Sequence, residues 1–202
     1  MSYLISRKLP IKIFWESYVT KRVESRRLIL QKGRMESKQH IILKILAYCY
    51  FWDRNLVIEP HVRLNRFRPD LIAWRKSEIP TQEELVPDLW IECKNVKLKK
   101  LRKLSRILPF SRIVWISSKQ SLARTLEYIQ SGKKSMYMSS NIQLIGIETS
   151  KPNWESLKES ISKKKLHWGV CWHSNDRMVI SIRESDNPVS LEFHTLPATI
   201  KT

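Results

Sequence analysis

Strand patterns alternate with helix patterns through the middle of the sequence. Short runs rich in β-branched and aromatic residues are separated by longer runs that lack Gly and Pro and carry apolar side chains at helical spacing. The predicted strands are residues 70–74, 88–94, 112–117 and 142–148, and the predicted helices are about 97–108 and 119–130. This alternation indicates an α/β sheet covered by helices.

The flanking segments have different patterns. Residues 36–52 form the clearest helix, apolar almost all round and therefore expected to be buried. Two extended segments are expected before it, and one helix with three strands after it, at residues 9–18, 25–31, 153–161, 166–173, 177–183 and 189–195. We therefore predict a single domain over residues 1–202, with an α/β core at 1–150 and a C-terminal helix and β-strand subdomain at 151–202.

The charge of the chain predicts a polyanionic partner. Lys and Arg number 37 against 19 Asp and Glu, a formal net charge of +18. Residues 1–140 hold 29 of the basic and 12 of the acidic side chains, so the predicted core carries almost all of the excess. A surplus of this size concerns binding rather than fold, and nucleic acid is the expected partner.

The cysteines and histidines do not predict a metal cluster. Cys49, Cys93 and Cys171 are far apart, odd in number and set in apolar runs, which favours reduced core thiols. The histidines of the predicted terminal strands have no Cys or acid at ligand spacing, so no structural metal is expected there. No apolar run has the length of a membrane span, and we predict a cytoplasmic protein with no membrane partner.

One predicted strand carries charges on a face that should be buried. In residues 88–94, DLWIECK, Glu92 and Lys94 are two positions apart and would project to the same side, roughly 6.6 Å apart. Isolated charges on a buried strand are costly unless they are paired or bind a ligand. A divalent cation with a phosphate beside it would compensate both, and it would require a second carboxylate.

Two acids could supply that carboxylate. Asp88 lies four residues before Glu92 on the same strand, about 13 Å away and too far to share one cation. Asp70 begins the neighbouring predicted strand, about 4.8 Å across the sheet. We therefore predict Asp70 as the first metal ligand, and Asp88 as a strand-entry residue paired with a surface base.

Glu36 is a third acid near the start of the predicted buried helix. Its position allows two interpretations: a charge satisfied by the helix dipole in the first turn, or an inward ligand near the site.

The helix after Lys94 is strongly basic. It holds six bases in ten residues and no acid: Lys97, Lys99, Lys100, Arg102, Lys103 and Arg106. Its leucines would pack inward, leaving the bases either as a solvated surface or as phosphate contacts. Beside an acid and lysine site we predict phosphate contact, without base-specific recognition, since no helix-turn-helix or zinc-finger spacing is present.

These motifs together resemble a known superfamily. RPDLIAW, followed 22 residues after Asp70 by IECK, is similar to the PD-(D/E)XK phosphodiesterase superfamily. Within it, the helix at 36–52, the strand DLWIECKN, the basic helix and the strand IVWIS resemble the YaeQ family. The likeness runs from about Glu36 to Ile129 and continues more weakly to the terminal strands.

The resemblance implies a fold and a reaction. The fold would be a restriction-endonuclease-like α/β core, a mixed central sheet flanked by helices, with a C-terminal β-rich appendage. Asp70, Glu92, Glu36 and the carbonyl of Cys93 would hold Mg²⁺ or Mn²⁺, and Lys94 would be the catalytic lysine. We therefore expect a metal-dependent nuclease, a DNA endonuclease first of all; the alternative is a nucleic-acid-binding protein that keeps the site only as scaffold.

Overall fold

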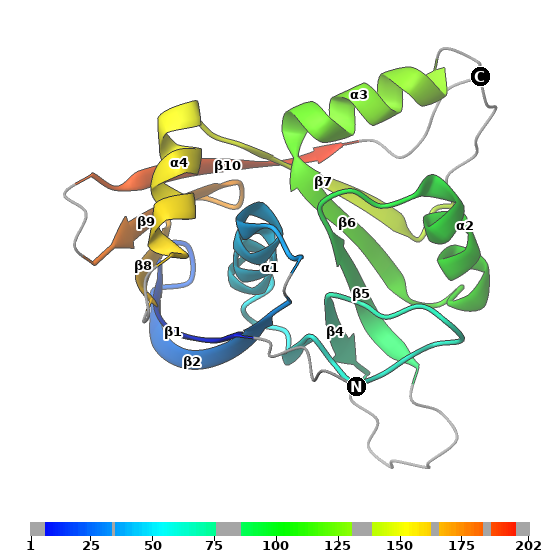
Figure 1. Cartoon of the computed structure of the whole chain (residues 1–202), viewed down its shortest axis with the longest axis horizontal. Helices are drawn as coiled ribbons and strands as arrows, with labels where there is room; N and C mark the ends of the chain where they lie inside the picture. Colours follow the sequence, from blue (N-terminus) through cyan, green and yellow to red (C-terminus); the bar gives the residue numbers. More distant parts are fainter. Residues whose placement is uncertain are drawn as a thin grey trace. The chain divides into compact units, whose positions relative to one another are not determined.

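Strands outnumber helices in the computed structural model, which describes residues 7–33, 35–75, 86–130, 139–162, 166–183 and 187–196. Of these residues, 44% lie in strands and 27% in helices. The strands are β1 (Arg7–Ser17), β2 (Arg22–Lys32), β3 (Leu56–Ile58), β4 (Leu71–Trp74), β5 (Pro87–Cys93), β6 (Arg112–Ser118), β7 (Ile142–Glu148), β8 (Leu166–Trp172), β9 (Arg177–Ile182) and β10 (Val189–Leu196). The helices are α1 (Lys38–Tyr50), α2 (Leu98–Ile107), α3 (Lys119–Gln130) and α4 (Lys151–Ser160) (Figure 1).

The predicted helices and strands are confirmed, with shifts of up to three residues at their ends. The short strand β3 was not predicted. By its internal contacts the chain divides into two compact units: Met1–Cys49 with Ile147–Phe193, and Tyr50–Gly146 with His194–Thr202.

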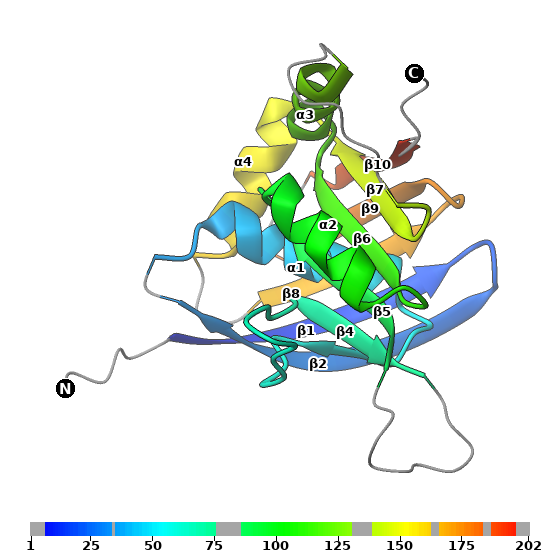
Figure 2. The ribbon, with the colours of Figure 1, turned by 90° about the vertical axis from the view of Figure 1, so that its right-hand side faces the viewer.

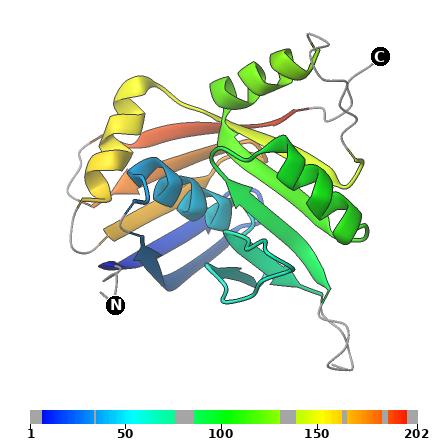
Figure 3. The same cartoon turned by 45° about the vertical axis from the view of Figure 1, so that its right-hand side comes forward.

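The first unit is built on a long hairpin. β1 and β2 pair antiparallel over eleven residues each, with Ile13 opposite Arg26, and the strand order of the unit is β2-β1-β8-β9-β10. β1 pairs parallel with β8, so that Ile13 also lies opposite Trp168. Alternate β1 side chains from Leu9 to Trp15 are buried, and the exposed positions between them face away from the core. Helices α1 and α4 lie on the buried side of β1 and β8 (Figure 3).

The second unit places the predicted acid-bearing strands side by side. Its strand order is β7-β6-β5-β4-β3, with β5 antiparallel to β4 and parallel to β6. Helix α2 packs through Leu101 and Leu104 into a buried cluster that contains Trp90, Ile113 and Trp115 (Figure 2). The apolar stripe predicted for the basic helix is confirmed by this packing, which fixes the bases on its other faces.

The predicted fold class is wrong. Strands predominate, and the C-terminal strands are not an appendage, because β8 pairs directly with β1. The molecule is therefore not a restriction-endonuclease-like core flanked by helices. The physical reason is that the β1 to β8 pairing joins residues about 150 positions apart, for example Ile11 and Leu166, and local periodicity carries no information on such a pairing.

None of the described helices combines the length and the apolar composition needed to cross a bilayer.

Candidate metal centre and basic helix

Asp70 and Glu92 come together across the pair of strands β4 and β5. Leu71 lies opposite Ile91 in this antiparallel pair, so the adjoining positions, Asp70 and Glu92, face each other. The Asp70 backbone N–H donates to the Ile91 carbonyl at 3.0 Å, and the Cys93 N–H donates to Oδ2 of Asp70 at 2.7 Å. The structure thus brings together the two acids that the sequence assigns to a metal site.

Glu92 is a buried carboxylate, with a relative exposure of 4%. The Trp90 indole N–H donates to its Oε1 at 2.8 Å, and the Lys100 ammonium lies 2.6 Å from its Oε2. Burial raises the pKa of Glu92; Lys100 and Trp90 oppose this shift, and the charge of Asp70 adds to it. Negative charge at this position is therefore costly even with a lysine in contact.

Lys94 does not continue the strand that carries Glu92. β5 ends at Cys93, and Lys94 has a left-handed backbone with φ of 68°. Its N–H donates to the Ile116 carbonyl at 2.9 Å, and the Trp115 indole N–H donates to its carbonyl. The predicted continuation of the strand through Lys94 is therefore wrong, because a left-handed residue turns the chain out of the extended conformation.

Lys100 is the lysine in contact with Glu92, although its sequence position predicted only a phosphate contact. It lies in the first turn of α2, eight residues after Glu92. The Trp90 contact had a signal in the sequence, since residues two apart on a strand share a face. The Lys100 contact had none, because it depends on how α2 packs against the sheet.

Asp88 lies where the sequence predicts. It is the second residue of β5, about half exposed, and its carboxylate is 3.4 Å from the Arg54 guanidinium. The predicted pairing of Asp88 with a surface base is confirmed.

Glu36 is held by a set of donors in the first unit. Its Oε1 lies 2.5 Å from the Lys44 ammonium and 2.9 Å from Nδ1 of His40, and the Gly33 N–H donates to its Oε2 at 3.1 Å. Burial alone would raise its pKa, but the bonds from His40 and Lys44 outweigh burial and lower the pKa to about 2. These contacts give Glu36 a structural partner in Lys44, and its role as a metal ligand stays a prediction.

The basic helix presents its charges as expected. Lys97 caps the start of α2 without a side-chain cap bond, and Lys99, Arg102 and Arg106 are exposed. Lys100 and Lys103 are half-buried.

The second unit also contains a pocket of about 630 Å³. It lies near the end of the strands that is opposite to Glu92, and its lining includes Phe110, Arg112, Gln143 and Thr195.

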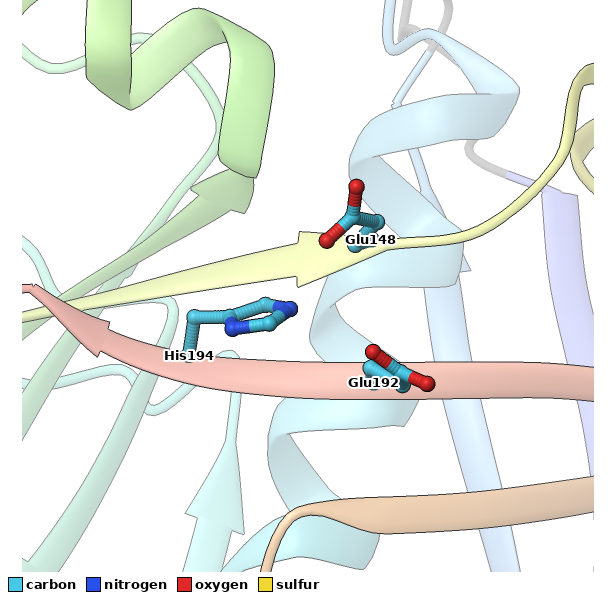
Figure 4. A group of neighbouring side chains, drawn as sticks. All are labelled: Glu148, Glu192 and His194. Atoms are coloured by element: carbon cyan, nitrogen blue, oxygen red, sulfur yellow. The ribbon is translucent and has the colours of Figure 1, made fainter.

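A second group of possible ligands was missed. The ligand atoms of Glu148, Glu192 and His194 lie within 4.8 Å of one another, the first from β7 and the other two from β10 (Figure 4). Glu192 precedes His194 by two residues on a strand, a pattern visible in the sequence. Both glutamates are exposed, which is common for acids that bind no ion, so these contacts alone assign no metal here.

The chain shares its fold with solved YaeQ proteins. The YaeQ protein from Xanthomonas axonopodis pv. citri matches with a TM-score of 0.70 and 16% identity, over 94% of this chain and 97% of that one. The YaeQ protein from Pseudomonas syringae matches with a TM-score of 0.66 and 13% identity, over 96% and 98%. No family model and no curated protein matches the sequence. The resemblance to YaeQ proteins is thus confirmed at the level of the fold, and membership of the PD-(D/E)XK superfamily stays a prediction.

Proposed function

We propose that the protein hydrolyses phosphodiester bonds in nucleic acid, with a divalent cation bound by Asp70 and Glu92. The observation that carries the proposal is the buried carboxylate of Glu92 facing Asp70 across the strand pair. Two neighbouring carboxylates repel each other, and a bound cation would remove that repulsion. The raised pKa of Glu92, due first to burial, is the expected property of such a site without its metal.

The residues present fit a hard cation such as Mg²⁺ or Mn²⁺. Such ions take carboxylate and carbonyl oxygens as ligands, and Asp70 and Glu92 provide carboxylates. A carboxylate oxygen has two lone pairs, so the bonds from Cys93 N–H, Trp90 and Lys100 leave acceptor capacity. When bound, the ion would polarise the phosphate and lower the pKa of a water molecule. Glu36 and the Cys93 carbonyl remain further predicted ligands.

Two lysines of the chain would contact the phosphate. Lys100 holds an ammonium group against Glu92, where it can stabilise negative charge on a phosphate placed beside the two acids. Lys94 follows β5 directly and stays the predicted catalytic lysine. Lys94 lies four residues before α2 and Lys100 lies in its first turn, so charge for catalysis and charge for binding are close along the chain.

The second candidate function is nucleic-acid binding without catalysis. The Lys100 ammonium already neutralises Glu92 at 2.6 Å, so the carboxylate has a partner without any metal. The two functions separate in a cleavage assay on branched, single-stranded and duplex DNA with Mg²⁺, Mn²⁺ or EDTA. We expect metal-dependent cutting that falls at least about 100-fold in Lys100→Ala or Lys94→Ala. Tight binding with no product from the unmodified protein in any metal would establish the binder instead.

Binding to DNA through α2 predicts a steep salt dependence. Six bases in contact with phosphates would release condensed counterions, so the logarithm of the binding constant should fall with the logarithm of the salt concentration at a slope of about −5. We expect this slope from fluorescence anisotropy with a labelled duplex in EDTA. Replacing Lys99, Arg102 and Arg106 by Gln should reduce the slope by about 3. An unchanged slope in this triple variant would exclude α2 as the contact surface.

A further inference from the structure

One face of the first unit's sheet is exposed to solvent. Helix α1 lies on the other face (Figure 2). Its residue Tyr48 accepts a hydrogen bond from the Arg26 guanidinium at 3.3 Å. Arg26 lies opposite the buried Ile13 in the hairpin, so both side chains are on the side that α1 covers. The positions between the buried ones therefore point outward from β2, β1, β8 and β9. No pattern in the sequence predicted a role for this face.

Two rows of outward side chains cross four strands in register. The first row is Ser25, Phe14, Gly169 and Ser181, from β2, β1, β8 and β9 respectively. The second row is Arg27, Lys12, His167 and Arg183 in the same order of strands, with Arg183 N–H bonded to the His167 carbonyl. The rows are two residues apart on each strand, about 6.6 Å. We call these eight residues the basic-aromatic face.

Phe14 has small residues beside it on both adjacent strands. The residue keeps 46% of its accessible surface, so its side chain is open to solvent. Ser25 and Gly169 lie on either side of it, and a Cβ added at Gly169 would meet only Ser181, at ordinary contact distance. The Lys12 ammonium lies 4.3 Å from the ring centroid. The strands beside the ring present only small side chains, so a base could stack on it once the Lys12 ammonium moves from the ring to a phosphate.

The bases of the second row are available to an anion. Among the described residues, none of Lys12, Arg27 and Arg183 forms an ion pair; Arg183 contacts the His167 ring at 3.3 Å. On β1 itself, Glu16 shares this side of the strand, two residues beyond Phe14. The face thus combines an exposed aromatic ring with basic side chains at a fixed spacing.

We propose that the basic-aromatic face binds single-stranded nucleic acid, with a base stacked on Phe14 and phosphates on Lys12, Arg27 and Arg183. Stacking on an aromatic ring needs an unpaired base, and basic side chains beside the ring bind the backbone that carries it. Duplex bases are already stacked and would leave Phe14 unused. The proposal does not rest on hydrolysis, because this face belongs to the first unit and binding needs no metal.

The test is anisotropy with labelled single-stranded and duplex DNA of one sequence, in EDTA. We expect Phe14→Ala to weaken single-strand binding about 5- to 100-fold, while Phe14→Trp retains it. Replacing Lys12, Arg27 and Arg183 by Gln should lower the salt slope for the single strand by about 2. All replaced side chains except the half-buried Lys12 are exposed, and thermal unfolding checks that each variant folds.

The control is Phe110→Ala, which removes a ring that is 76% exposed in the second unit and should leave binding unchanged. Single-strand binding unaffected by Phe14→Ala would overturn the proposal. So would an equal loss for single strand, duplex and polyglutamate, which would show a face that attracts any polyanion. Binding to vesicles with anionic lipid that is lost in the same variants, with oligonucleotide binding retained, would assign the face to a membrane surface instead.

Discussion

Asp70→Asn and Glu92→Gln are each expected to reduce metal-dependent phosphodiester cleavage by at least about 100-fold. A bound cation contributes several kcal/mol of stabilisation to the transition state, and each 1.4 kcal/mol is tenfold in rate. Either amide keeps the shape of the side chain but removes the charge that holds the cation. The measurement is the initial rate of product formation with Mg²⁺ or Mn²⁺, compared with the unmodified protein.

The matched control for this prediction is Asp88→Asn on the same strand. Asp88 is about half exposed and pairs with Arg54 away from Glu92, so its amide should leave the rate within about twofold. Glu92→Gln should also remain folded, because the amide oxygen of the new side chain can still accept from Trp90. Equal rates for the unmodified protein and both site variants would rule out this pair of acids as the catalytic centre.

The site was predictable where it depends on adjacent strands and not where it depends on packing. Asp70 directly precedes β4 and Glu92 is the last residue but one of β5, and two short strand patterns separated by a polar linker were enough to place them together. The left-handed Lys94 gave no pattern, since a non-glycine residue adopts that conformation only where surrounding bonds hold it. The Lys100 contact needed the position of α2 on the sheet.

The fold was likewise predictable in its local elements and not in its long-range strand pairing. The periodicity of residues 36–52 predicted α1, and the apolar runs of the middle segment predicted β5 and β6. The charged residues of β1, Lys8, Lys12 and Glu16, lie on the outward face, where strand alternation places polar side chains, and the apolar Phe14 on the same face is what departs from that pattern. What could not be predicted is that β1 accepts β8 as its parallel neighbour, because strand partners are chosen by the whole core.

Glu36→Gln is expected to destabilise the protein by about 3 kcal/mol. Lys44 is a buried lysine, with only 3% of its side chain exposed, and its ammonium lies 2.5 Å from Glu36. Removing one partner of a buried ion pair leaves the other charge uncompensated, which costs about 3 to 5 kcal/mol. The amide that replaces the carboxylate would retain one weaker bond, which places the expected loss at the lower end. Urea unfolding followed by circular dichroism measures the difference.

The matched control is Glu155→Gln, which breaks the pair of Glu155 with Lys158 on α4. That pair has a similar distance, 2.7 Å, but its side chains are 54% and 36% exposed. Solvent-exposed pairs contribute at most about 1 kcal/mol, so this variant should be nearly as stable as the unmodified protein. Equal losses in Glu36→Gln and Glu155→Gln would show that burial of Lys44 does not matter.

The pH dependence tests the same pair without changing its geometry. The folded pKa of Glu36 is about 2 and lies below the ordinary value of 4.5, so the unfolded state binds the proton more readily. The contribution of Glu36 to stability is therefore fully present above about pH 4.5 and is lost as the pH falls toward 2. Glu36→Gln should be less stable than the unmodified protein at pH 7, and the difference should shrink across this window.

A double variant with Lys44→Met should recover most of the loss at pH 7, because an apolar side chain then occupies the buried position without a charge to neutralise.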